Sequence, residues 1–164
     1  LVGSEMCIRD RNGKLLLLNY VISDTNDVDT DFYIGPNTIW SSTKVSISSR
    51  MCCKAIKKKI KSKRLDHLFH EYGTPFYCKI DIEGNELNAL HGAQRMLDEG
   101  KIDVIQMEFG GCNIDSRTYF RDFWNLLSAK YKVYRVLLDG VEEITEYGDI
   151  LEIFFCTNYL FVRK

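Results

Sequence analysis

The stretch that decides the fold is FYCKIDIEGNELNALHGAQRML, residues 76–97. Its first seven residues are mostly apolar and end among acids, which is typical of a short buried strand. The part that follows has apolar residues three and four positions apart, the spacing of an amphipathic helix: Leu87, Leu90, Ala93 and Leu97. Glu83 and Glu86 suit the start of that helix, and Gly100 is placed to end it. A strand followed directly by a helix is therefore predicted.

The residues after this helix continue the alternation. Residues 102–109 predict a second strand, which ends at Glu108 and Phe109 before two glycines. A strand–helix–strand unit of about 30 residues implies parallel strands joined by a right-handed crossover. Residues 116–130 then predict a helix, and residues 131–138 and 153–162 two more strands. No clear helix separates these last strands, which permits antiparallel pairing, so the chain is predicted to be α/β.

Upstream of the deciding stretch the pattern is weaker. Residues 14–23 and 28–34 predict strands around a turn, and the Ser- and Thr-rich residues 37–53 predict a loop or irregular strand. Residues 54–64 hold seven basic residues in eleven, a pattern that leaves a helical turn and a solvated edge strand both open. Asp66 is then expected to cap a brief helix that Gly73 ends.

The composition excludes several classes of protein. The 164 residues suit one domain, with 45% hydrophobic and 27% charged residues, which is globular usage. A net charge of -1 gives no bulk attraction to nucleic acid or anionic membrane, and the basic run lacks the aromatic residues that stack on single strands. No apolar run approaches the ~20 residues of a membrane span, and no signal peptide opens the chain. We therefore expect a cytoplasmic protein, with nucleic acid an unlikely partner.

The candidate metal and disulfide residues lack the usual spacings. Six cysteines contain no C-x-x-C pair, which predicts free, mostly buried thiols in a reducing compartment. His67 and His70 are three apart but have no third ligand at a telling spacing, so they are interpreted as exposed or capping residues, and no metal site is assigned. Residues 1–11 show no periodicity and are interpreted as a non-native leader, with the domain spanning residues 12–164.

Residues 79–94, KIDIEGNELNALHGAQ, closely resemble the K-I-D-x-E-G-x-E-x-x-x-L-x-G-A signature of FkbM-type methyltransferases. The pair Leu65–Asp66, the acid Glu108 and residues 158–161 resemble flanking segments of the same family, so the resemblance runs from about Leu15 to the C-terminus. It implies an S-adenosylmethionine-dependent enzyme on a partial class I, Rossmann-like sheet with flanking helices and a C-terminal antiparallel strand. The implied reaction is methylation of a hydroxyl on a sugar, glycan or other small metabolite.

The acids of the signature occupy the place where open α/β sheets bind ligands. Asp81, Glu83 and Glu108 follow or end predicted strands and should converge on one crevice. Carboxylates there can hold the cationic parts of S-adenosylmethionine, bind a divalent cation or accept a hydroxyl proton. We therefore predict Asp81 and Glu83 as catalytic, Asp81 and Gly84 as cofactor-binding, and Glu86 and Glu108 as substrate or metal candidates. The alternative is a capped helix in another α/β protein.

Two motifs of the family do not occur in this sequence. They are the glycine loop of the D-x-G-A-N-x-G kind and the strand that ends in E-P. Residues 15–23 resemble the third strand, which implies that Ser23 and Asp24 lie near the adenine of the cofactor. The first strands are thus expected to be missing, so the 164 residues alone should bind S-adenosylmethionine poorly.

The alternative from another class is a non-catalytic remnant or interaction domain with a methyltransferase-like fold. DNA that encodes a glycine loop and an E-P segment ahead of Leu15 would favour the enzyme, and a start codon just ahead of Leu15 would favour the remnant. A third possibility, methylation of RNA guided by the basic run, is distinguished by supplying RNA and labelled cofactor. The oligomeric state is left open.

Overall fold

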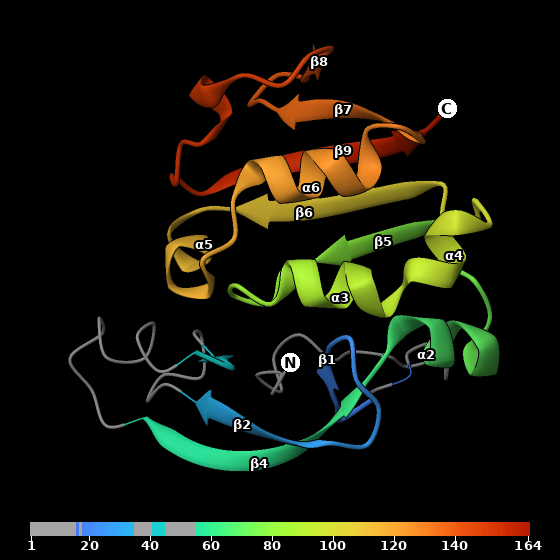
Figure 1. The fold of residues 1–164 in the computed structure, drawn as a ribbon, viewed down its shortest axis with the longest axis vertical. Helices are drawn as coiled ribbons and strands as arrows, with labels where there is room; N and C mark the ends of the chain where they lie inside the picture. The colour runs from blue at the N-terminus through green and yellow to red at the C-terminus, as the bar shows by residue number, and fades with distance from the viewer. Residues whose placement is uncertain (1–15, 17, 35–40, 45–54) are drawn as a thin grey trace.

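A computed structural model describes residues 16, 18–34, 41–44 and 55–164 (Figure 1). They form two β-sheets with helices, so the predicted α/β class is confirmed. The proposed leader, residues 1–11, lies outside the described residues, as does most of the loop predicted over residues 37–53. Within the described part of the chain, no helix is long and apolar enough to cross a membrane.

The larger sheet has five strands in the order β5-β6-β9-β7-β8. Their bounds are β5 Tyr77–Ile80, β6 Val104–Phe109, β9 Thr157–Arg163, β7 Tyr131–Val136 and β8 Val141–Ile144. β5 and β6 are parallel, with Ile80 opposite Met107, and β9 runs antiparallel to both β6 and β7. The predicted parallel pair and the antiparallel last strand are therefore confirmed, whereas β8 was not predicted.

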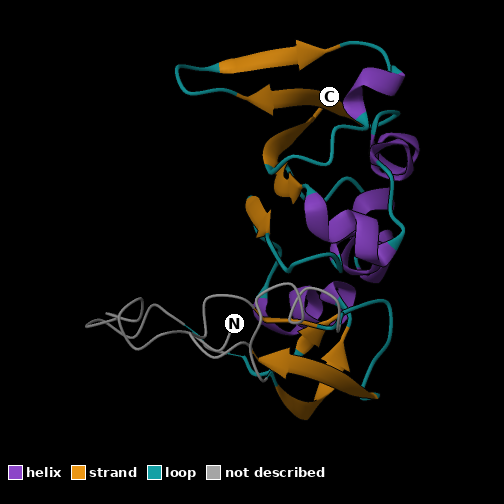
Figure 2. Ribbon diagram, turned by 90° about the vertical axis from the view of Figure 1, so that its left-hand side faces the viewer, coloured by secondary structure: helices purple, strands orange, loops and turns teal. Residues whose placement is uncertain are grey.

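The helices gather on one side of this sheet (Figure 2). They are α3 Glu86–Gly92, α4 Gln94–Asp98, α5 Gly111–Ser116 and α6 Phe120–Leu127, with a 3-10 turn, η2, at Asp149–Leu151. β6 alternates accordingly, because Ile105, Met107 and Phe109 are fully buried and the residues between them are half-buried. The ring of Phe109 lies edge-on to Phe120 and Phe123, with centroids 5.5 and 6.2 Å away. The core therefore lies between the sheet and the helices.

The smaller sheet has the order β1-β4-β2-β3. Its strands are β1 Val21–Ile22, β4 Ile56–Lys63, β2 Asp29–Ile34 and β3 Ser41–Ser42. The expectation of one partial sheet is therefore only partly right: β1, the proposed third strand, pairs with β4 and not with the larger sheet. No described strand lies between β1 and β5 to join the two sheets.

The basic run forms β4, an inner strand of the smaller sheet. β4 pairs with β1 on one side and with β2 on the other, so neither the helical turn nor the edge strand is correct. Its lysines face acids across the sheet: Lys57 lies 2.7 Å from Asp31 and Lys61 lies 2.8 Å from Asp29. These exposed pairs offset part of the charge of the run, which reduces the attraction it could offer to nucleic acid.

Asp66 caps a different helix from the one predicted. α2 spans Leu65–Tyr72 and its N-cap residue is Arg64, so Asp66 lies two positions too far along the chain to cap it. The carboxylate instead accepts hydrogen bonds from the backbone N–H groups of Arg95 and Met96, at 3.1 and 3.0 Å. These amides belong to the first turn of α4, whose N-cap residue Ala93 has no side-chain acceptor. The single predicted helix is therefore broken at Ala93 and stabilised there by Asp66.

Candidate active site

The register of β5 and β6 brings two of the predicted acids to the same edge of the sheet. Ile80 ends β5 opposite Met107, so Asp81 and Glu108 follow as the next facing positions. Asp81 is exposed, and its carboxylate lies 2.9 Å from the ammonium of Lys79, two residues earlier on the same side of the strand. The carboxyl ends of these parallel strands therefore carry acids side by side, as predicted.

Glu83 and Gly84 form a turn in an uncommon backbone conformation between β5 and α3. Both have positive φ, +57° at Glu83 and +95° at Gly84. A Cβ on Gly84 would lie 2.8 Å from the carbonyl oxygen of Cys112, so glycine is required both by the dihedral and by the close approach of α5. Glu83 has no such freedom and is held there by its surroundings.

Glu86 stabilises this turn by accepting hydrogen bonds from its backbone. It is only 2% exposed, and its Oε1 accepts the backbone N–H groups of Ile82 and Gly84, at 3.1 and 3.0 Å. Its Oε2 is buried and has no hydrogen-bond partner among the described residues. Burial raises the pKa of Glu86, although the backbone hydrogen bonds oppose that shift. The structure thus gives Glu86 a supporting position under the turn, while its role as a substrate or metal residue stays a prediction.

The side chain of Glu83 meets a thiol that the sequence did not single out. Cys112 Sγ donates to Glu83 Oε2 at 2.7 Å. Burial raises the pKa of Glu83, and the charges of Asp81 and Glu108 raise it further. Burial and the neighbouring Glu83 raise the pKa of Cys112, so the thiol keeps its proton and acts as a donor. Asp81 and Glu108 act on the pKa of Glu83 because their carboxyl groups lie near it.

A second thiol lies beside Glu108. Burial raises the pKa of Cys156, and the charge of Glu108 and a hydrogen bond between the two side chains raise it further. Gly110 makes this contact possible, because a Cβ there would lie 3.0 Å from the Cα of Cys156. The described cysteines are free, as predicted, but Cys112 is only half-buried and Cys156 is exposed. The position of Cys112 just after Gly110–Gly111 was the one sequence signal for these thiols.

Ser23 and Asp24 lie beside a different part of α3. The carbonyl oxygen of Ser23 packs so closely on Gly92 that a Cβ there would lie 2.2 Å away. Ser23 Oγ donates to Asp24 Oδ1, and the carbonyl of Asp24 accepts a bond from Arg64. These residues are therefore at the C-terminal end of α3, whereas the acids are at its N-terminal end. No hydrogen bond or ion pair among the described residues joins the two groups.

The acids do not form a metal cage among the described residues. No group of three or more His, Cys, Asp and Glu side chains is arranged there to hold a metal ion. His67 and His70 are both exposed on α2, as is His91 on α3. The site holds carboxylates at the edge of a sheet, partly removed from water, and each lies beside a hydrogen-bond donor. Such carboxylates can bind a cationic ligand or accept a proton from a substrate.

One family model matches most of the chain. The family described as the methyltransferase FkbM domain matches residues 12–136, which include Asp81, Glu83, Gly84, Glu86 and Glu108. The chain has no significant match among curated proteins or solved structures.

Proposed function

We propose that this chain, which belongs to the FkbM methyltransferase family, transfers a methyl group from S-adenosylmethionine to a hydroxyl of a small molecule or glycan. The observation that carries this proposal is the grouping of Asp81, Glu83 and Glu108 at the carboxyl ends of β5 and β6. Ligands of open α/β sheets bind at such ends.

The acids fit a cationic methyl donor. When bound, S-adenosylmethionine supplies an electrophilic methyl group next to a positive sulfonium. Asp81 and Gly84 stay proposed to hold it, with Asp81 exposed and Gly84 buried in the turn beside it, where Cys112 packs in the place of a side chain. A cation at this point would relieve the repulsion that Asp81 and Glu108 exert on Glu83. Ser23 and Asp24 stay proposed as contacts on the adenine side.

Glu83 is the best candidate for the group that takes the hydroxyl proton. A carboxylate whose pKa is raised by burial holds a proton more readily near neutral pH than a solvated one does. Cys112 orients it through the bond to Oε2, and Glu86 supports the turn that carries it. Asp81 assists at the exposed side of the same edge. Proximity and alignment of the hydroxyl account for the rest of the rate.

The test compares acids at the carboxyl ends of the strands with an acid at the opposite end of β6. In the complete product of the gene, Asp81→Asn and Glu83→Gln should each lower methyl transfer from labelled cofactor by about 10²–10⁴-fold, the usual contribution of a general base. Asp103→Asn is the control, because Asp103 precedes β6 at its other end and pairs with exposed Arg163. Unchanged turnover and cofactor affinity in Asp81→Asn would remove Asp81 from the mechanism.

A calorimetric titration separates the enzyme from the non-catalytic alternative. The 164 residues alone are expected to bind S-adenosylmethionine poorly, and micromolar affinity would contradict that expectation. A complete gene product that neither binds the cofactor nor transfers methyl groups would favour the remnant or interaction domain. A cytoplasmic location is also proposed, because the described cysteines are free thiols.

A further inference from the structure

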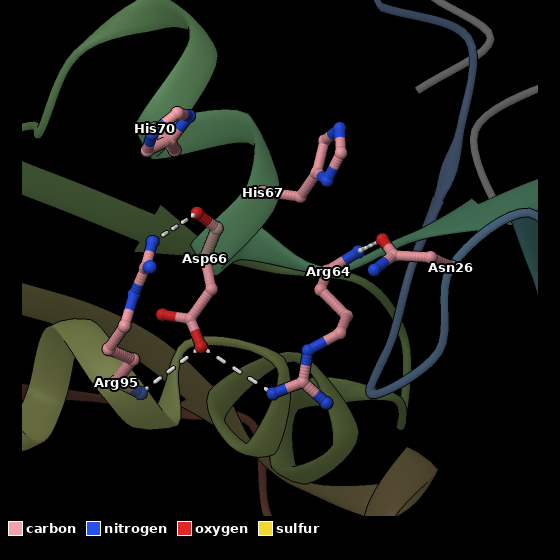
Figure 3. Close-up of a pocket in the computed structure, with 6 residues that line it drawn as sticks. All are labelled: Asn26, Arg64, Asp66, His67, His70 and Arg95. Atoms are coloured by element: carbon pink, nitrogen blue, oxygen red, sulfur yellow. Dashed lines mark hydrogen bonds and ion pairs between the residues drawn. The ribbon is translucent and has the colours of Figure 1, made fainter.

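A cavity of about 500 Å³ lies away from the acids, between α2, α4 and the loop after β1 (Figure 3). Its volume is in the range of small-molecule sites. All six residues that line it are polar or charged: Asn26, Arg64, Asp66, His67, His70 and Arg95. Arg95 lies on α4, beyond the break at Ala93, whereas Glu86 lies in the first turn of α3 under the acidic turn. None of the three acids lines this cavity, although Arg64 in its wall donates to the carbonyl of Asp24, which is proposed as an adenine-side contact.

The one carboxylate in the cavity wall is already used by the fold. Asp66 accepts backbone N–H groups of α4 at both of its oxygens, as described above. Arg64 is likewise committed, since it donates to the carbonyl of Asp24 at 2.7 Å and to the carbonyl of His91 at 3.1 Å. These bonds join α2, α3 and the loop after β1, so the wall is held in place before any ligand binds.

The groups left over in the wall are hydrogen-bond donors. The side chains of His67 and His70 are exposed, and neither makes a hydrogen bond to the other residues of the wall (Figure 3). The exposed Arg95 donates one bond, 3.3 Å long, to the backbone oxygen of Asp66. Asn26 uses its oxygen to accept from Arg64 N, which leaves its N–H groups available. These donors line the wall of the cavity together with the carboxylate of Asp66, which is already hydrogen-bonded to α4.

We infer that this cavity binds the phosphate group of a small molecule, at a place distinct from the acidic sheet edge where methyl transfer is proposed. Guanidinium groups match the geometry and charge of phosphate, and phosphate has more acceptor oxygens than a carboxylate to meet four donor side chains. The cavity lacks an aromatic side chain, so the stacking that single-stranded nucleic acid needs is missing from its wall.

The test titrates the chain with ribose 5-phosphate and with ribose, and follows the imidazole signals of His67 and His70 by NMR. Ribose 5-phosphate should bind saturably and ribose should not. Arg95→Gln should weaken binding at least about tenfold, the effect of one lost charge-assisted hydrogen bond. The control, Arg121→Gln, removes an exposed arginine on α6 outside the cavity and should leave affinity unchanged.

A second variant covers the case in which Arg95→Gln disturbs α4. His67→Gln combined with His70→Gln changes two exposed side chains without hydrogen bonds to the other residues of the wall, and it should also weaken binding about tenfold. The inference fails if ribose 5-phosphate does not saturate below about 10 mM, a free energy weaker than about 3 kcal/mol. It also fails if both folded variants bind like the parent, or if only RNA or phosphatidylserine vesicles bind.

Discussion

Replacing Gly84 by alanine should destabilise the chain more than the same change at Gly73. The two glycines have nearly the same dihedral, φ +95° at Gly84 and +96° at Gly73. They differ in what a side chain would meet. A Cβ at Gly84 would lie 2.8 Å from the carbonyl oxygen of Cys112, whereas one at Gly73 would meet nothing within 4 Å. Comparing them separates backbone strain from the close approach of α5.

The expected losses follow from these two contributions. A side chain at positive φ costs about 1–3 kcal/mol, which applies to both positions. Crowding against fixed backbone adds about 1–3 kcal/mol at Gly84 alone. Gly73→Ala should therefore lower the free energy of unfolding by about 1–3 kcal/mol and Gly84→Ala by about 2–6 kcal/mol. Gly140→Ala, with open space and no positive φ, should change it by less than about 0.5 kcal/mol.

Urea unfolding followed by far-ultraviolet circular dichroism measures all three differences in one assay. A loss at Gly84 no greater than that at Gly73 would refute the packing of Cys112 on the turn. Because this contact holds Glu83 next to Cys112, the same outcome would weaken the proposed position of the base. A loss at Gly140 as large as that at Gly73 would show that the backbone dihedral is not the cause.

Two further predictions concern carboxylates. Burial raises the pKa of Glu86, so its contribution to stability is full below its unfolded pKa near 4.5 and is lost as pH rises through the raised value. As pH rises from 4.5 to neutrality, the free energy of unfolding of Glu86→Gln, measured with urea, should therefore increase relative to that of the parent. A difference between the two that does not change with pH would contradict this. Asp66→Ala should lower the free energy of unfolding by about 1–3 kcal/mol, because two amides of α4 lose their acceptor. Thermal unfolding measures this, and Asp98→Ala, which breaks an exposed pair with Lys130, should cost at most about 1 kcal/mol.

The elements that were predicted well are those with local signals. β5, the helix start after it and β6 follow from the spacing of apolar residues within residues 76–109. The break at Ala93 carried no such signal, because the cap of α4 comes from Asp66, almost thirty residues earlier. β4 also lacks a local signal. Its lysines are typical of a solvated segment, and only its pairing with β1 and β2 shows that it is an inner strand.

The candidate site shows the same division. The positions of Asp81, Glu83 and Glu108 at strand ends were predictable, since the carboxyl ends of parallel strands share one edge. The thiols of Cys112 and Cys156 were not, because the close approaches at Gly84 and Gly110 bring them to the acids from other elements. The burial of Glu86 could not be predicted from the sequence either, although its place in the first turn of a helix could.

The sequence by itself determined the family, the parallel strand pair and the edge at which the acids stand. These depend on spacings within one short stretch, where each residue constrains its neighbours through the backbone. Only the tertiary structure decided that Asp66 caps α4, that β4 lies inside a second sheet and that Arg95 lines one cavity with two histidines. Such contacts join residues far apart in the chain, and no local periodicity records them.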